Sequence, residues 1–168
     1  MKTIKGFIAI FSIMLAAAFA ASAQVNLATL DGTRVNVEGQ NGKVVVLAIG
    51  ASWLPLSDKQ AEFTNALAKK YAGKNVVIYF VATDSVNQKS KNFATNDAIS
   101  KFAFGNKLAV PVLRDSDGAA TLKRFNVEQV PSFVILDKNG KLAGDPFGGI
   151  DPKYDVTIPI SKAIDKLL

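Results

Sequence analysis

Two almost wholly apolar runs, residues 44–49 and 75–82, flank a stretch with helical periodicity. Apolar runs of this length are typical of strands that are buried on both faces of a sheet. In the stretch between them, Phe63, Leu67 and Tyr71 recur at every fourth position, which predicts a helix that buries one face. A strand, a helix and a second strand of this kind predict a βαβ unit. We therefore expect an α/β fold with a sheet that is at least partly parallel.

Short elements separated by turn signals make up the rest of the chain. There are no repeats and no low-complexity linker, so residues 24–168 are expected to form one domain. Asp31 and Gly32 predict a tight hairpin turn between two short strands. The other expected features are an N-cap at Ser57 or Asp58, a helix within residues 85–105 anchored by Phe93, Ile99, Phe102 and Phe104, a strand at 110–113, a turn at 115–118 that caps a helix at 119–125, a hairpin of 132–137 with 141–143, and a C-terminal amphipathic helix.

Residues 1–23 have the features of a cleavable export signal. Lys2 and Lys5 precede an apolar stretch over residues 7–20, and a small-residue cleavage site, Ala-Ser-Ala, ends at Ala23. The alternative is an uncleaved anchor, which requires about 20 apolar residues to span a bilayer, more than this stretch provides. We expect the mature protein to be periplasmic or secreted in a bacterium, with no stable membrane insertion after cleavage.

The chain contains neither Cys nor His. This excludes thiol redox chemistry, cysteine nucleophiles, disulfides, imidazole acid–base catalysis and zinc sites built from Cys and His. The formal net charge is +6, but the lysines are scattered rather than grouped in a stripe with aromatic residues. A solvated surface is therefore expected rather than a nucleic-acid interface. The sequence predicts no bound cofactor and no nucleic-acid partner.

Carboxylates occur in two places where a site could be sought. Asp115 and Asp117 have a spacing found in calcium-binding loops, but the other oxygen ligands and the closing Glu of such a loop are missing. Asp145, Asp151 and Asp155 lie in or near Gly- and Pro-rich sequence. Turn formation with helix capping is expected for the first pair and turn formation for the other three, with no metal bound. The sequence has no phosphate-binding Gly motif and no Gly-x-Ser-x-Gly nucleophile elbow.

Three segments, taken in order, resemble a known family. Residues 42–53 read Gly-Lys-Val-Val-Val-Leu-Ala-Ile-Gly-Ala-Ser-Trp, residues 115–118 precede a predicted short helix and Phe-Asn-Val, and residues 130–141 read Val-Pro-Ser-Phe-Val-Ile-Leu-Asp-Lys-Asn-Gly-Lys. Together they resemble thioredoxin-like proteins, in particular the exported TlpA/redoxin branch related to peroxiredoxins, over most of residues 27–168. The resemblance implies a thioredoxin-like fold, a central mixed β-sheet flanked by helices, here with an N-terminal β-hairpin extension.

In this family the Trp is followed by Cys-x-x-Cys, and here Leu54 and Ser57 stand at the positions of the two thiols. Leu54 has neither a nucleophile nor a titratable proton. Ser57 has a hydroxyl but no His to activate it, so N-capping, worth about 1 kcal/mol, is its expected role. A chain without these thiols, and without any peroxidatic or resolving Cys, is expected to have no catalytic residues of the family.

Pro131 matches the cis-proline of the family, which faces the redox site. The alternative is a trans proline that begins an edge strand. The resemblance implies that the backbone of Val130, just before it, pairs with an extended substrate peptide, an interaction that requires no thiol. The residues expected to form a binding surface are Trp53, Leu54, Pro55, Leu56, Val130 and Pro131.

The sequence leaves two questions open at this surface. Leu54 and Leu56 either form an exposed apolar patch for a partner or pack against neighbouring helices. Three functions are compatible with the residues: an exported, redox-inactive domain that binds a protein or an extended peptide; a thiol-independent enzyme that uses Asp, Lys, Tyr or Ser on the same scaffold; and a cysteine-free variant, natural or engineered, of a thiol-disulfide oxidoreductase or redoxin. No constellation of residues supports the second, and the third would keep the partners of its parent without turnover.

Overall fold

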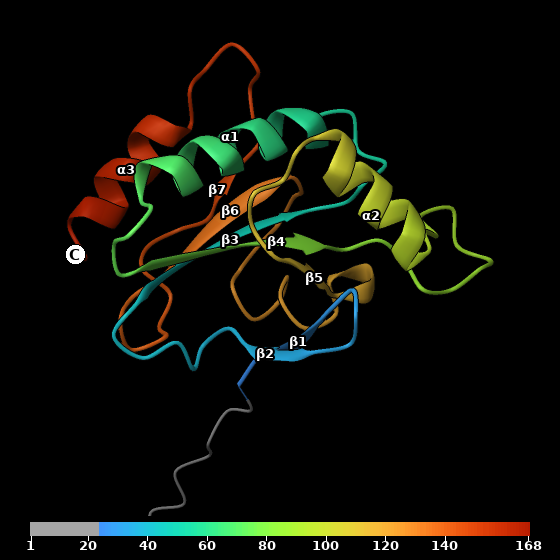
Figure 1. Ribbon diagram of the computed structural model, residues 1–168, viewed down its shortest axis with the longest axis horizontal. Helices are drawn as coiled ribbons and strands as arrows, with labels where there is room; N and C mark the ends of the chain where they lie inside the picture. The colour runs from blue at the N-terminus through green and yellow to red at the C-terminus, as the bar shows by residue number, and fades with distance from the viewer. Residues whose placement is uncertain (1–23) are drawn as a thin grey trace, which may run out of the picture.

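The two apolar runs form the centre of a seven-stranded sheet (Figure 1). In the computed structural model, which describes residues 24–168, β3 (Val44–Gly50) and β4 (Val76–Ala82) pair in parallel, and α1 (Ser57–Lys70) connects them. The predicted βαβ unit is therefore confirmed. The predicted export leader, residues 1–23, lies outside the described residues. Within residues 24–168, no helix is both long and apolar enough to cross a membrane.

The remaining elements are β1 (Asn26–Thr29), β2 (Arg34–Asn36), α2 (Asn96–Gly105), β5 (Val112–Arg114), the 3₁₀ turn η1 (Ser116–Gly118), β6 (Ser132–Leu136), β7 (Phe147–Gly148) and α3 (Thr157–Asp165). The order across the sheet is β2-β1-β5-β4-β3-β6-β7. The sheet is mixed because β5 is parallel to β4, whereas β6 is antiparallel to β3. The predicted N-terminal hairpin is present as antiparallel β1 and β2.

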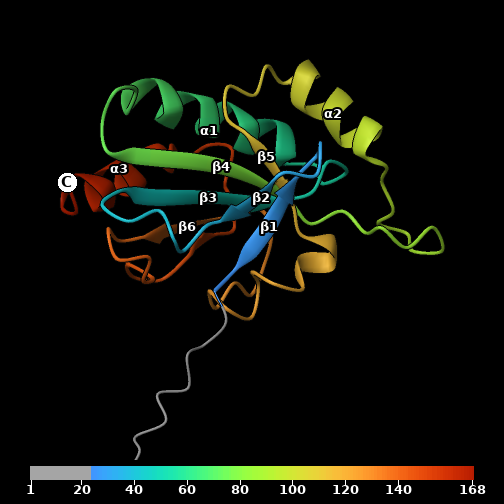
Figure 2. The same ribbon diagram turned by 60° about the horizontal axis from the view of Figure 1, so that its bottom comes forward.

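The residues of β3 alternate between two cores on opposite faces of the sheet. Those at every second position from Val44 belong to a core that includes Phe63 of α1 and Ile164 of α3. The intervening residues, from Val45 onward, belong to a second core with Phe125 and residues of the β1–β2 hairpin. Figures 1 and 2 show α1 and α2 on the same side of the central strands. Because both faces of β3 are covered, every residue of the strand is buried.

The helix predicted over residues 119–125 is wrong, because this segment forms a series of turns instead. Asp117 and Asn126, on either side of it, have positive φ values of 58° and 55°. Backbone of this kind cannot continue an α-helix, so only isolated helical turns fit between the two residues. The predicted turn at Asp115 is present, and its carboxylate accepts hydrogen bonds from two backbone N–H groups of the segment, both at 2.9 Å, but no helix follows for it to cap.

The aromatic anchors predicted for the α2 region are partly wrong. Ile99 is fully buried, and the Phe102 ring packs against that of Phe80 with centroids 5.6 Å apart. Phe93 and Phe104, in contrast, are exposed. A helix on the surface of a domain buries only one stripe of side chains. The stripe of α2 contains Ile99 and Phe102, which leaves Phe104 in solvent.

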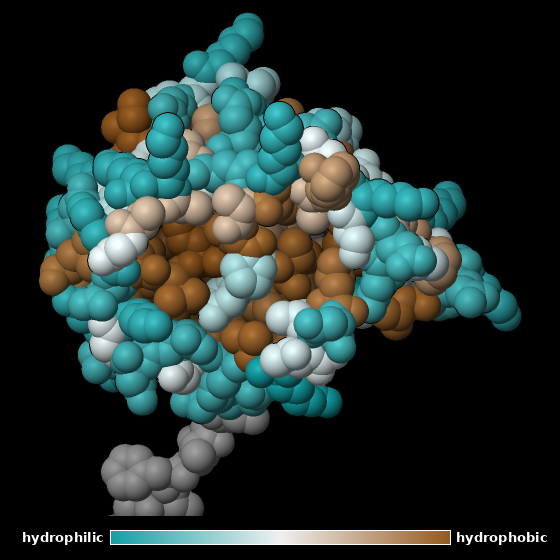
Figure 3. Space-filling view, in the orientation of Figure 1, coloured by the Kyte–Doolittle hydropathy of each residue, from teal (hydrophilic) through white to brown (hydrophobic). Residues whose placement is uncertain are grey.

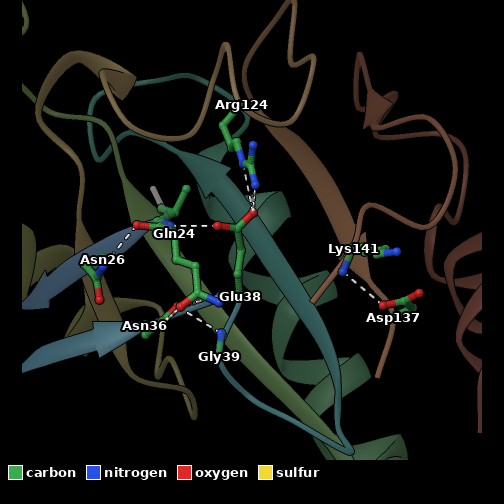
Figure 4. A network of polar contacts seen from close by, with 9 residues as sticks. Gln24, Asn26, Asn36, Glu38, Gly39, Arg124, Asp137 and Lys141 are labelled. Atoms are coloured by element: carbon green, nitrogen blue, oxygen red, sulfur yellow. Dashed lines mark hydrogen bonds and ion pairs between the residues drawn. The ribbon is translucent and has the colours of Figure 1, made fainter. Parts of the chain in front are cut away.

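An ion pair between a buried carboxylate and a partly exposed arginine ties the β1–β2 hairpin to the turns that cover the second core (Figure 4). The carboxylate of Glu38, which follows β2, accepts two N–H groups of Arg124, both at 2.8 Å. Its other oxygen accepts the backbone N–H of Val25 at 2.7 Å. Glu38 is buried, so these bonds compensate for the water that its charge has lost. They also fix the chain just before β1.

Loss of this ion pair should be costly. We expect Arg124→Met to lower the free energy of unfolding by about 2 kcal/mol, because it leaves the buried Glu38 carboxylate without its cation. The matched control is Lys59→Met, which removes the exposed Lys59–Glu62 pair and should cost less than about 0.5 kcal/mol. Urea denaturation of both variants measures the difference, and equal losses would contradict the role given to Glu38.

Candidate functional site

The strand register brings the two predicted binding segments to one end of the sheet. β3 leads at its carboxyl end into residues 53–57, which we call the Trp53 loop. β6 is antiparallel to β3, and Ser132 at its start pairs with Ile49 near the end of β3. Val130 and Pro131, which we call the cis-proline edge, directly precede Ser132. The loop and the edge are therefore neighbours in space although they are far apart in the sequence.

The peptide bond between Val130 and Pro131 is cis. Pro131 is buried, whereas Val130 is partly exposed. Among the described residues, neither the N–H nor the C=O of Val130 has a hydrogen-bond partner. A cavity of 380 Å³ lies beside this edge, and its lining includes Glu128 and Asp145. The edge thus combines free backbone groups with a polar hollow.

The Trp53 loop exposes its first and third residues. Trp53 is 50% exposed and Pro55 is also exposed. Leu54 is half-buried, and Leu56 packs against the core under α1. The question that the sequence left open is therefore answered differently for the two leucines: Leu56 is part of the packing, while Leu54 retains accessible surface. Trp53 is the aromatic residue of the loop.

The N-cap role predicted for Ser57 is wrong. Ser57 is the first residue of α1, its side chain is buried, and its hydroxyl donates a hydrogen bond to the carbonyl oxygen of Ala51. The cap position belongs to Leu56, which has no side-chain cap bond. An N-cap side chain must accept a bond from an N–H two or three residues later, and the inward-facing hydroxyl cannot reach one. Asp58 does not cap the helix either, since its carboxylate accepts a bond from Asn106.

A buried carboxylate that the sequence analysis missed fixes the chain just before the Trp53 loop. Asp84 lies just beyond the end of β4 and is fully buried. Its carboxylate accepts the backbone N–H of Ser52 at 3.0 and 3.2 Å and the Ser52 hydroxyl at 2.5 Å. Ser52 directly precedes Trp53, so these bonds fix the start of the loop. Hydrophobic periodicity carries no signal for such a residue, because the pairing depends on strand register.

Removal of the Ser52 hydroxyl tests this support. We expect Ser52→Ala to lower the free energy of unfolding by about 2 kcal/mol, because it deprives a buried carboxylate of one of its donors. Ser90→Ala in an exposed loop is the control and should change stability by less than about 0.5 kcal/mol. Thermal unfolding of both variants measures the difference. A Ser52→Ala protein as stable as the control would show that Asp84 does not depend on this bond.

Gln60 of α1 joins the loop helix to both strands of the site. Its side-chain Nε2 donates to the carbonyl oxygens of Ile49 at 3.1 Å and Ser132 at 2.9 Å. The side chain is fully buried, and its Oε1 would be only 2.2 Å from a Cβ at Gly50. Gly50 is therefore required for space. This amide fixes the distance between the Trp53 loop and the cis-proline edge, and the sequence analysis did not find it.

The other carboxylates near the surface have structural roles. Asp151 and Asp155 accept backbone N–H groups two residues further on, at 2.8 and 2.9 Å, which confirms the turn-forming role predicted for them. A hydrogen bond from the hydroxyl of Thr157 holds the pKa of Asp155 below its ordinary value of 3.8, and a hydrogen bond from the backbone N–H of Thr157 adds a smaller effect in the same direction. Within residues 24–168, no group of three or more acidic side chains is arranged to hold a metal ion.

Solved structures with the same arrangement of strands and helices are thioredoxin-like. The exposed lipoprotein thioredoxin Etrx1 of Streptococcus pneumoniae strain TIGR4 superposes with a TM-score of 0.68 at 25% identity, over 86% of this chain and all of that one (100%). A secreted Mycobacterium tuberculosis disulfide oxidoreductase superposes with a TM-score of 0.61 at 23% identity, over 86% of this chain and 96% of that one. The predicted thioredoxin-like fold is confirmed.

Curated relatives extend the likeness to sequence. The thiol-disulfide oxidoreductase ResA of Bacillus thuringiensis subsp. konkukian is 27% identical over 113 residues, which are 67% of this chain and 60% of ResA. The thioredoxin-like protein YneN of Bacillus subtilis is 27% identical over 115 residues, which are 68% of this chain and 62% of YneN. The chain thus spans about 60% of the length of these relatives. The redoxin family model matches residues 16–153, and the chain belongs to the redoxin family.

Leu54 and Ser57, the positions predicted to correspond to the two thiols of the family, are joined by a backbone hydrogen bond. The N–H of Ser57 donates to the carbonyl oxygen of Leu54 at 3.0 Å, so the two residues close one turn at the start of α1. The double variant Leu54→Cys/Ser57→Cys is expected to form an intramolecular disulfide and to gain insulin-reductase activity, because the helix N-terminus stabilises a thiolate. The unmodified chain and each single variant are the controls and should show none. A double variant that stays unreactive would contradict the assigned positions.

Proposed function

We propose that this redoxin-family chain is an exported, redox-inactive domain that binds an extended peptide or a segment of a partner protein across the Trp53 loop and the cis-proline edge. The state of the two former thiol positions carries the proposal. Leu54 has no reactive group. The Ser57 hydroxyl is buried and donates a hydrogen bond to the carbonyl oxygen of Ala51. Neither can attack a disulfide or a peroxide, so the surface that these positions form is suited to binding alone.

The backbone of the cis-proline edge supports an extended ligand. An added strand needs N–H and C=O groups without other partners, and both groups of Val130 meet this condition within the described residues. Trp53 offers a large, half-exposed aromatic surface beside the edge. Aromatic side chains of this kind supply much of the energy in protein interfaces. A peptide held by Val130 would therefore place a neighbouring apolar side chain on Trp53.

The cavity beside the edge indicates a preference for a basic side chain. Glu128 and Asp145 both line it, and neither is in an ion pair within residues 24–168. A Lys or Arg of the bound peptide would neutralise this charge. We therefore infer a ligand that combines an apolar residue for Trp53 with a basic residue for the cavity.

Export is part of the same proposal. The features of residues 1–23 support it, as do the similar structures, one of which is an exposed lipoprotein and another a secreted oxidoreductase. A domain outside the cytoplasm meets unfolded or extended segments of other exported proteins, which are ligands of the proposed kind.

Trp53 itself provides the test, because it is the only Trp in the chain. Extended peptides that combine apolar and basic residues are titrated into the purified protein while the tryptophan emission is recorded. A saturable blue shift is expected for a subset of them, because the bound peptide removes water from the indole. Leu54→Asp should raise the peptide Kd at least about 10-fold, because it places a desolvated charge in the apolar contact.

Leu168→Asp is the matched control, because Leu168 is also a partly exposed leucine but lies at the C-terminus of the chain. It should leave the peptide Kd unchanged. The same peptide with N-methylated backbone positions should bind more weakly, since it cannot pair with Val130. Binding that Leu54→Asp leaves intact would move the site elsewhere, and a Trp53 emission that no peptide changes would contradict the proposal.

A further inference from the structure

Phe104 is the most exposed of the large apolar side chains within residues 24–168, at 87%. It lies on α2, the helix that the sequence expected it to anchor. Its neighbours on the same helical face, Asp97, Ser100 and Lys101, are all exposed as well. Phe104 lies in the last turn of α2, and its ring buries little surface in the monomer. Aromatic side chains are enriched among the residues that dominate the binding energy of protein interfaces.

An apolar hollow lies directly beside this ring. It has a volume of 400 Å³, and its lining comprises Thr29, Leu30, Asp31, Ser100, Ala103, Pro111 and Val112. A cavity of about 150 Å³ is enough to hold benzene, so a phenyl ring fits with room to spare. Pro111 also lines a second hollow of 270 Å³ along β4. Figure 3 shows the resulting brown, apolar depression between the helices above and the hairpin below.

We propose that this face binds a second copy of the chain, with Phe104 of each copy inserted into the hollow of the other. The ring and the hollow lie side by side on one surface, since Ser100, one turn before Phe104, lines the hollow. With a twofold axis near Ser100, the ring of each copy faces the hollow of the other, so the ring–hollow contact occurs twice. This is the self-complementary arrangement of a twofold dimer. The proposal is independent of the peptide site at the Trp53 loop.

The contacts of α2 with the β1–β2 hairpin define the register of the two helices. With the two α2 helices antiparallel, Phe104 of one copy lies over the N-terminal end of α2 in the other. There Asn96 donates to the carbonyl oxygen of Leu30 at 2.9 Å, so Leu30 of the hollow is beside that end. The same register places Lys101 opposite Asp97 of the other copy. The ring of one copy thus lies near Leu30, at one end of the hollow of the other.

Charge complementarity favours a second copy as the occupant. The hollow side carries Asp31 and Asp97, and the ring side carries Lys101 and Lys107, all exposed. None of the four is in an ion pair within residues 24–168. A hydrogen bond from the hydroxyl of Thr29 holds the pKa of Asp31 below its ordinary value of 3.8, and one from the backbone N–H of Thr33 adds to this effect. The Asp31 carboxylate is therefore charged at neutral pH. Charges of opposite sign therefore meet twice across the twofold axis.

Sedimentation equilibrium of the purified protein, from about 1 µM to about 1 mM, tests the proposal over the range in which weak homodimers form. A reversible monomer–dimer equilibrium is expected. Phe104→Asp should raise the dimer Kd at least about 30-fold, as expected of a central aromatic residue. Because Phe104 is exposed in the monomer, its thermal unfolding at low concentration should not change. Ile158→Asp, at a residue 65% exposed on α3, is the matched control and should leave the Kd unchanged.

A charge swap tests the register. Lys101→Glu and Asp97→Lys should each weaken the homodimer, because each places like charges opposite one another twice. An equimolar mixture of the two variants should form a heterodimer tighter than either homodimer, since both contacts are then restored. A chain that stays monomeric throughout, or a dimer that Phe104→Asp leaves intact, overturns the proposal. A mixture that shows no preference for the heterodimer overturns the antiparallel register.

Discussion

The pairing of Ile49 with Ser132, at the end of β3 and the start of β6, is the constraint on which the candidate site depends. It places the Trp53 loop and the cis-proline edge side by side, and Gln60 reinforces it with hydrogen bonds to the carbonyl oxygens of both paired residues. The close approach of Gln60 is possible only because position 50 is Gly. From the neighbouring strand, the buried Asp84 fixes Ser52 at the start of the loop. The loop and the edge are therefore held in place by strand pairing and by two buried polar side chains.

Thiol chemistry and the proposed peptide binding depend on different parts of the site. Thiol chemistry depends on two sulfur atoms, and replacement by Leu54 and Ser57 removes it entirely. Peptide recognition depends on backbone groups and exposed aromatic surface, which these replacements leave in place. The inward hydroxyl of Ser57 even adds a hydrogen bond within the loop. The proposed binding function thus depends on parts of the site that require no thiol.

Much of the architecture could be predicted from the sequence because it follows from local patterns. The apolar runs of β3 and β4, the Asp31-Gly32 turn and the spacing in α1 each specify an element by themselves. The errors lie where tertiary contacts decide. Ser57 has the residue type of an N-cap, but its hydroxyl is turned inward to Ala51. Residues 119–125 have helical composition, but the positive φ values at Asp117 and Asn126 interrupt them. Asp84 and Gln60 gave no signal, because burial of a polar side chain depends on partners from other elements.

The sequence by itself determined the βαβ framework and the absence of thiol and imidazole chemistry, because periodicity and composition are properties of the chain alone. Only the tertiary structure decided which apolar residues remain in solvent. Leu56 and Phe102 pack against the core, whereas Trp53 and Phe104 do not, although all four have side chains that favour burial. The reason is geometric: a helix or loop can turn only one face toward the sheet, and the residues on its other face are exposed whatever their hydrophobicity.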